Sequence, residues 1–123
     1  MKPSVLVIDD DPFTREALAA ILVRAGYQVD SLAGAGWEGE AESFSQLYQV
    51  AVVDFHLPTV NGLELARRLK ACQPECRIIM ISSELPRLPE SAASVVVDRF
   101  LAKPFSKDVI LEAIALLCPP QAP

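Results

Sequence analysis

Four short runs of apolar residues recur along the chain, and in each of them the apolar character is continuous rather than alternating. The runs cover residues 4–8, 50–53, 77–81 and 99–102, and a weaker run covers 27–32. Continuous apolarity indicates strands that are buried on both faces, as in a parallel sheet covered by helices. The pattern therefore predicts a five-stranded sheet, which needs helical segments between its strands.

Segments with the periodicity of helices lie between these runs. The two clearest cover residues 13–25, between Pro12 and the stop at Gly26, and residues 106–117, which begin at the N-cap Ser106. A third helix is predicted over 62–72. The residues expected to face inward in the two clearest helices are Ala17, Leu18, Ile21, Leu22 and Ala25 in the first, and Val109, Ile110, Ala113, Ile114 and Leu117 in the last.

Two further helices have weaker patterns. Gly39 weakens a helix over 37–48, because Gly in a helix interior costs about 1 kcal/mol relative to Ala. Pro86 and Pro89 exclude a regular helix directly after the fourth strand and leave only about residues 90–97. The alternation of strands and helices predicts a three-layer α/β domain, in which right-handed crossovers place helices on both faces of the sheet.

Composition sets the domain organisation and excludes some function classes. A chain of 123 residues with 51% hydrophobic residues can build one core, so we assign 1–118 to a single domain and 119–123 to a Pro-rich tail or linker stub. The net charge of -5 argues against direct binding to nucleic acid or to an anionic membrane. No apolar run of eighteen residues and no signal-peptide core is present, which predicts a cytoplasmic protein.

The three cysteines do not indicate a metal site. Cys72, Cys76 and Cys118 are odd in number, and their spacings are unlike the usual zinc patterns. We expect them to be reduced thiols, buried or half-buried.

Polar residues follow the predicted strands at the edge where a parallel sheet forms its functional crevice. They are Asp9 and Asp10 after the first strand, Asp54 after the third, Ser82 after the fourth and Lys103 after the fifth. If the first and third strands are neighbours, their ends lie only about 4.8 Å apart, so the three carboxylates share one small site. Such crowding implies a hard divalent cation, and Mg²⁺ fits best because it takes oxygen ligands and few of them from protein.

With these residues in place, the chain resembles the response-regulator receiver family, of which the chemotaxis regulators are members. The resemblance runs from Ser4 to about Leu117. It is carried by residues 5–12 with the acidic pair, 53–58 together with Asn61-Gly62, 80–83 and 103–105. It implies a doubly wound, flavodoxin-like (βα)5 fold with strand order 2-1-3-4-5, an order for which a receiver is itself a standard example.

The resemblance also implies a role for each site residue. Asp54 is the expected phosphoacceptor. Asp10, Asp9 through water, Asp54 and the backbone carbonyl of His56 are the expected ligands of Mg²⁺, with Mn²⁺ as an alternative. The expected switch residues are Ser82 and Phe100, the expected countercharge is Lys103, and a cis peptide bond is expected before Pro104.

The function implied is a phosphoacceptor domain of a two-component system rather than an enzyme. A histidine kinase or phosphotransfer protein would phosphorylate Asp54, and the surface formed by segment 90–97, the strand at 99–102 and the helix at 106–117 would then change. A downstream protein, an effector domain or a phosphorylation-dependent homodimer is the expected output.

Two departures from the family pattern and two alternatives remain. Ser82 replaces the more frequent Thr, and the His56 side chain borders the expected path of attacking water.

Taken singly, Asp54, Ser82, Lys103 and Phe100 would be an ordinary cap, turn residue, surface charge and core residue, and only their joint placement favours a site. Asp9-x-Asp11 superficially matches an aspartyl phosphatase motif, but Phe13 stands where that motif wants Thr or Val. A phosphorylation-independent interaction domain is the other alternative.

Overall fold

The computed structural model describes residues 2–33, 47–57, 62–83 and 96–119. Their helices and strands follow in the order β1 Ser4–Ile8, α1 Pro12–Arg24, β2 Gln28–Leu32, β3 Val50–Asp54, α2 Gly62–Cys72, β4 Arg77–Ser82, β5 Arg99–Ala102 and α4 Lys107–Leu117. The helices predicted over 37–48 and 90–97 lie largely outside the described residues. Where their ends are described, at 47–48 and 96–97, the chain is not helical.

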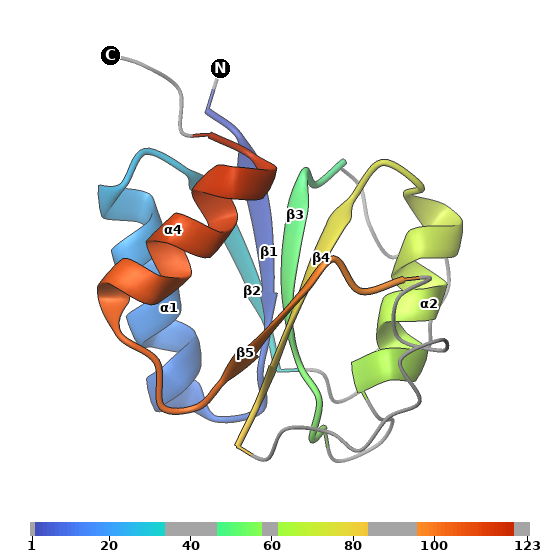
Figure 1. Ribbon diagram of the computed structural model, residues 1–123, viewed down its shortest axis with the longest axis horizontal. Coiled ribbons are helices and arrows are strands. Elements are labelled where there is room, and N and C mark those ends of the chain that lie inside the picture. Colours follow the sequence, from blue (N-terminus) through green and yellow to red (C-terminus); the bar gives the residue numbers. More distant parts are fainter. Residues whose placement is uncertain (1, 34–46, 58–61, 84–95, 120–123) are drawn as a thin grey trace.

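The five strands form one parallel sheet in the order β2-β1-β3-β4-β5. Figure 1 shows α1 and α4 on one face of this sheet and α2 on the other, so the strands lie in a middle layer. The predicted three-layer α/β fold with strand order 2-1-3-4-5 is therefore confirmed. The order reverses between β1 and β3, which places the crevice of the sheet at the carboxyl ends of these two strands.

Hydrophobic burial divides into two cores, one on each face of the central strands. All five residues of β3 are buried, and in β4 only Arg77 is exposed, as expected for strands covered on both sides. Side chains from α1 and α4 pack against one face, and side chains from α2 pack against the other. The central strands are thereby packed on both faces, and their polar carboxyl ends lie at one edge of the sheet.

The helix faces are narrower than the sequence pattern predicted. Leu18 and Leu22 of α1 and Ile110, Ala113 and Ile114 of α4 are buried, as expected. Ala17 is exposed, and Val109 is 43% exposed, so both predictions were wrong. These two positions lie at the margin of the apolar stripe, where a helix resting on a sheet curves away from it.

Strand and helix ends also differ slightly from the predicted bounds. Strands β3 and β4 each include one more residue, because Asp54 pairs with Ile81 and Ser82 pairs with Ala102 in the ladder. Helix α1 starts at Pro12 with Asp11 as its N-cap, and Gly26 follows its end with a φ of 103°, a left-handed conformation that favours glycine. The predicted cap Ser106 accepts a hydrogen bond from the backbone N–H of Val109 at 3.2 Å.

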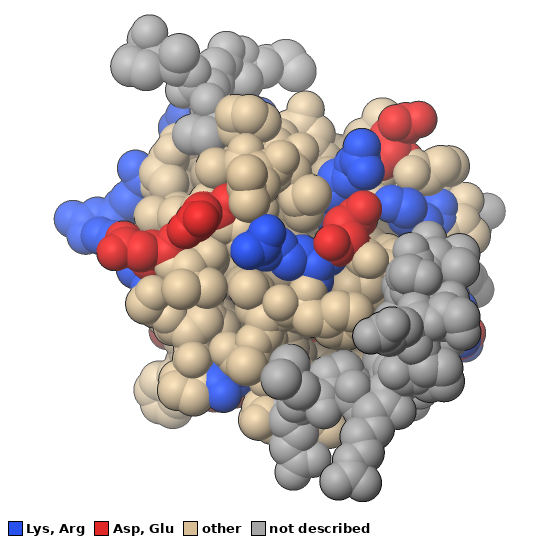
Figure 2. All heavy atoms as spheres, in the orientation of Figure 1, with Lys and Arg blue, Asp and Glu red and all other residues tan. Residues whose placement is uncertain are grey.

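Charged side chains of both signs share the surface. On the face shown in Figure 2, the described Lys and Arg side chains lie beside Asp and Glu rather than in a separate basic patch. The cysteines Cys72, Cys76 and Cys118 are free thiols, of which Cys76 is buried. In the described part of the chain, no helix has the length and apolarity that a membrane crossing requires.

Candidate functional site

Three carboxylates meet at the carboxyl edge of the sheet. Strands β1 and β3 are neighbours in register, with Ile8 opposite Val53, so the residues that follow Ile8 come close to Asp54. One oxygen from each of Asp9, Asp10 and Asp54 lies within 4.8 Å of the other two. Asp9 is 0% and Asp54 is 4% exposed, whereas Asp10 is exposed. Two carboxylates therefore form the floor of the site, and the third stands at its rim.

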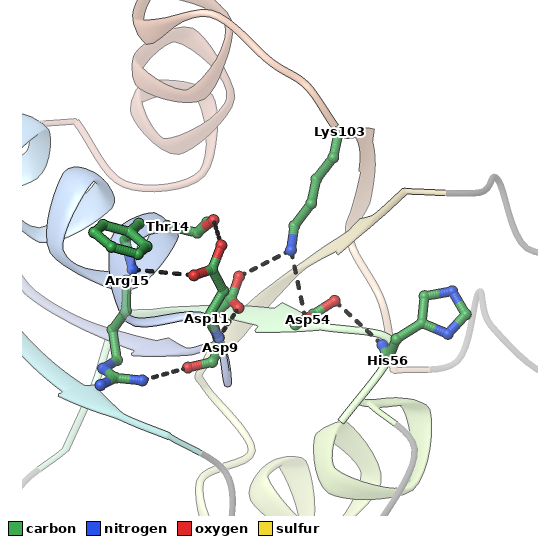
Figure 3. Close-up of polar contacts among 8 residues, drawn as sticks. Asp9, Asp11, Thr14, Arg15, Asp54, His56 and Lys103 are labelled. Atoms are coloured by element: carbon green, nitrogen blue, oxygen red, sulfur yellow. Dashed lines mark hydrogen bonds and ion pairs between the residues drawn. The ribbon is translucent and has the colours of Figure 1, made fainter. Parts of the chain in front are cut away.

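Lys103 extends into this cluster from the loop that follows β5 (Figure 3). Its Nζ lies 3.5 Å from Oδ2 of Asp54 and 3.0 Å from Oδ2 of Asp9. The sequence analysis expected Lys103 at this edge of the sheet as a countercharge for a phosphoryl group, but it predicted neither of these direct contacts. The peptide bond between Lys103 and Pro104 is cis.

Burial and charge compete in setting the protonation of the site. Burial raises the pKa of the Asp54 carboxyl, and the Asp9 carboxylate adds to the effect, while the backbone N–H of His56 at 3.2 Å and the Lys103 ammonium oppose it. Burial by itself would lower the pKa of Lys103, but its hydrogen bond and charge interaction with Asp9, together with Asp54, raise it. Lys103 is thus held in its charged form, and the carboxylates of Asp9 and Asp54 share its ammonium.

The turn that follows β1 directs Asp9 and Asp11 differently. The backbone N–H of Asp11 donates to Oδ1 of Asp9 at 2.9 Å, which folds the turn over the buried carboxylate. The Asp11 side chain accepts hydrogen bonds from Phe13 N at 3.1 Å and Thr14 Oγ1 at 2.7 Å, and these bonds lower its pKa. Asp11 therefore caps α1, and its carboxylate is oriented toward the helix and not toward Asp54.

Arg15 belongs to the site although the sequence analysis did not identify it. Its Nη1 donates to the backbone carbonyl oxygen of Asp9 at 2.8 Å (Figure 3). A signal was available, because helical side chains point back toward the N-terminus of their helix, and a long side chain in the first turn of α1 can reach the end of β1. What the sequence does not reveal is which acceptor the guanidinium selects.

The remaining predicted residues lie around the cluster at different depths. Ser82 is buried at the end of β4, and its carbonyl accepts the backbone N–H of Lys103 at 2.8 Å. Phe100 lies on β5 opposite Met80 and is partly buried against the core on the α2 side. Figure 3 shows the His56 ring pointing away from the carboxylates, so only its backbone contacts Asp54.

Gly62 permits close packing beneath Asp54. Its N–H donates to the carbonyl of Phe55 at 2.8 Å, at the start of α2. A Cβ atom at this position would meet Phe55 Cα at 2.7 Å and would come closer still to the backbone oxygen of Asp54. Only glycine allows the helix to approach the acceptor strand this closely.

An apolar groove of about 510 Å³ opens beside Lys103, between α1 and the loop that leads to α4. Phe13 stands in it with 81% of its surface exposed. The groove is lined by Phe13, Thr14, Ala17, Leu18, Ile21, Ser83, Lys103, Pro104 and Phe105.

Comparison with known proteins identifies the class to which this fold and site belong. The family model of the response regulator receiver domain matches residues 5–115. The chain belongs to this family, which is a family of signalling domains, and the resemblance drawn from the four motifs is confirmed.

The chain matches only part of the length of several relatives. It is 31% identical over 113 residues to the C4-dicarboxylate transport transcriptional regulatory protein DctD of Rhizobium meliloti, which covers 90% of this chain and 24% of that protein. The chain thus spans about a quarter of this relative's length.

Two solved structures are similar to the whole domain. A CheY-like response regulator receiver domain protein from Methanospirillum hungatei has a TM-score of 0.85 and 26% identity, covering 94% of this chain and 93% of that one. A response regulator from Burkholderia pseudomallei, solved with a phosphorylated aspartic acid, a calcium ion and citrate, has a TM-score of 0.78 and 30% identity. It covers 94% of this chain and 66% of that one.

Proposed function

We propose that Asp54 is the residue of this receiver domain that accepts a phosphoryl group, and that a histidine kinase or phosphotransfer protein is the donor. The observation that carries the proposal is the position of Asp54: a buried carboxylate within 3.5 Å of the Lys103 ammonium and beside two further carboxylates. The phosphorylated aspartic acid in the similar Burkholderia protein supports the same chemistry.

The donor set fits a hard divalent cation. The candidate ligand atoms are carboxylate oxygens of Asp9, Asp10 and Asp54, and they lie close enough to share one ion. Mg²⁺ prefers such ligands, and Mn²⁺ accepts them too. We propose these three residues and the carbonyl of His56 as ligands, with Asp9 acting through water. When bound, the ion supplies positive charge next to the oxygens of the phosphoryl group.

The residues of the chain itself account for the nucleophile and its countercharge. An Asp54 oxygen forms the new bond to phosphorus, and the bond from phosphorus to the donor's histidine nitrogen breaks, with its electron pair leaving on that nitrogen. Burial raises the pKa of Asp54, which makes its carboxylate more basic, while Lys103 favours the ionised form that attacks. After transfer, the Lys103 ammonium pairs with a phosphoryl oxygen.

Ser82 and Phe100 are proposed to convert phosphorylation into a change of surface. Ser82 ends the strand beside Asp54, and Phe100 lies on the next strand, β5. We expect the Ser82 hydroxyl to bond the phosphoryl group and Phe100 to turn inward, which changes the conformations populated by the surface to which β5 and α4 contribute. A shift of the two-state conformational equilibrium from 1:99 to 99:1 requires about 5.5 kcal/mol of differential stabilisation. One hydrogen bond supplies less than this, so charge pairing with Lys103 must contribute.

The groove beside Lys103 is the proposed contact for the phosphodonor. A donor histidine that reaches Asp54 must bring its own surface over the rim of the site, and the groove begins at that rim. Its exposed Phe13 and apolar walls suit the apolar face of a helix. Phe13→Ala should therefore slow transfer from a protein donor while leaving transfer from acetyl phosphate unchanged.

Other properties of the whole protein follow as proposals. The net charge of -5 and the mixed surface charges of Figure 2 favour protein partners over direct contact with nucleic acid or membrane. We also propose a cytoplasmic location, as the sequence analysis expected. We propose that the domain is not an enzyme beyond assisting its own phosphorylation. Steady turnover of p-nitrophenyl phosphate would contradict this.

The test is phosphorylation by acetyl phosphate with Mg²⁺, followed by intact mass spectrometry. The wild type should gain the mass of one phosphoryl group, and Asp54→Asn should not. Asp108→Asn, which removes an exposed carboxylate at the start of α4, is the matched control and should behave as wild type. Equal labelling of wild type and Asp54→Asn would refute the assignment. Absence of labelling and of Mg²⁺ binding in wild type would favour a phosphorylation-independent interaction domain.

A further inference from the structure

Arg15 binds the main chain of the acidic turn at both of its ends. Its backbone N–H donates to the carbonyl oxygen of Asp11 at 2.9 Å, which is the first hydrogen bond of α1. Its side-chain Nη1 donates to the carbonyl oxygen of Asp9 at 2.8 Å. Asp10 lies between these two carbonyls, so one residue of α1 brackets the backbone that carries the Asp10 carboxylate.

The flanking carboxylates are held by bonds of their own. The Asp9 carboxylate accepts a hydrogen bond from the backbone N–H of Asp11 and forms an ion pair with Lys103. The Asp11 carboxylate accepts hydrogen bonds from the Phe13 N–H and the Thr14 hydroxyl. Asp10 is exposed, and among the hydrogen bonds and ion pairs described for this site none involves its carboxylate. The Asp10 carboxylate has no such bond of its own among the described residues, so the place from which it extends depends on its backbone, which lies between the two carbonyls that Arg15 binds.

The choice of acceptor also has an electrostatic consequence. Figure 3 shows the Arg15 guanidinium and the Lys103 ammonium reaching Asp9 from opposite sides. Because Arg15 binds a carbonyl oxygen, it adds positive charge beside three acidic groups without occupying any carboxylate oxygen that a ligand would use. Arginine suits this task because its charge is permanent and its donors are held in a rigid plane.

We infer that Arg15 is a positioning residue, which aims the Asp10 carboxylate at the cation site through the main chain of residues 9–11. This inference rests on the proposed function, in which Asp10 is a ligand of Mg²⁺. Partners that orient a metal ligand typically affect affinity by 10- to 100-fold. Because Arg15 acts through the backbone and not through the carboxylate itself, we expect an effect at the lower end of that range.

The experiment measures Mg²⁺ affinity by isothermal titration calorimetry, with the unfolding free energy determined separately in EDTA. Arg15→Met keeps the length of the side chain and removes its donors and charge, and Arg15→Lys restores one charged donor. Arg24→Ala is the matched control, since it removes the same charge from an exposed position in the last turn of the same helix. We expect Mg²⁺ affinity to fall about tenfold in Arg15→Met, to recover partly in Arg15→Lys and to stay within about twofold of wild type in Arg24→Ala.

A purely structural role for Arg15 would give a different result. Arg15→Met would then lower the unfolding free energy but leave the Mg²⁺ affinity of the folded protein equal to that of Arg24→Ala, and this outcome would overturn the inference. Should Arg15→Met fail to fold, Arg15→Lys against Arg15→Gln decides the question, because equal affinities in that pair also overturn it. Failure of the proposed function is distinguishable, since wild type would then bind no Mg²⁺.

Discussion

The two ends of the parallel sheet both carry partly buried charges, but they balance them differently. At the amino ends of β4 and β5, the single carboxylate of Asp98 contacts Lys70 at 3.7 Å and Arg77 at 3.4 Å, and it accepts the N–H of Ile78 at 2.8 Å. At the carboxyl ends, a cluster of three carboxylates has two cations beside it: the Lys103 ammonium, which contacts two of them, and the Arg15 guanidinium, which binds a backbone carbonyl. One end has more cations than anions around its carboxylate, and the other has more anions than cations.

This difference separates a structural ion cluster from a functional one. The Asp98 cluster joins the start of β5 to β4 and to the end of α2, and its hydrogen bonds are completed within the chain. The cluster around Asp54 keeps an excess of negative charge, which a bound cation would neutralise. An excess of buried charge, rather than burial of charge as such, distinguishes the end of the sheet that we propose to bind a cation.

The largest expected effect tests the two lysines against each other. Lys103→Met should reduce the rate of phosphorylation by acetyl phosphate about 100-fold, because it removes a preorganised charge at the transferred group. Lys70→Met removes an ammonium from the opposite end and should leave this rate unchanged. Single-turnover phosphorylation at saturating Mg²⁺ measures both. Equal rates in the two variants would mean that the charge excess has no catalytic consequence.

A smaller effect is expected at the amino end. Asp98→Ala should lower the unfolding free energy by about 2 kcal/mol, because it leaves the Ile78 N–H and two cations without their shared acceptor. Urea denaturation in EDTA measures the change. Phosphorylation of the folded variant should be normal, and a loss of phosphorylation would show that the two ends are coupled.

The smallest expected effect has the opposite sign. Asp54→Asn should raise the unfolding free energy by about 1 kcal/mol at pH 7 without metal, because it removes a buried charge that is repelled by Asp9. The folded pKa of Asp54 lies above its unfolded value, so the ionised group destabilises the native state at neutral pH. As pH falls through that folded pKa, the wild-type carboxyl becomes protonated. The difference in unfolding free energy between wild type and Asp54→Asn should then fall toward zero.

Urea denaturation of both proteins between pH 7 and pH 4 measures this gap. Asp108→Asn serves as control, since the exposed Asp108 carboxylate lies outside the site. A gap that widens toward low pH would show that Lys103 lowers the Asp54 pKa more than burial raises it.

Local patterns were sufficient to predict the elements that carry the site. Continuous apolar runs identified four of the five strands, a weaker run identified β2, and helical periodicity identified α1, α2 and α4. The residues at the strand ends followed directly, because parallel strands bring their carboxyl ends to one edge. Asp54, Asp9 and Asp10 were thereby predicted as neighbours before any geometry was known.

Side-chain paths between distant segments could not be predicted in the same way. Lys103 contacts Asp9 across 94 positions of sequence, and its choice between two carboxylates depends on the depth and direction of the loop after β5. The exposure of Ala17 and Val109 depends likewise on how each helix rests on the sheet.

The sequence by itself determined the fold class, the strand order through its family, and the set of acidic residues at one edge. Only the tertiary structure decided that Arg15 binds the carbonyl of Asp9 and not a carboxylate, and that Lys103 lies closer to Asp9 than to Asp54. The physical reason is one of range. Strand and helix formation follow from nearest neighbours along the chain, whereas the selection of a hydrogen-bond acceptor depends on atoms brought together by packing.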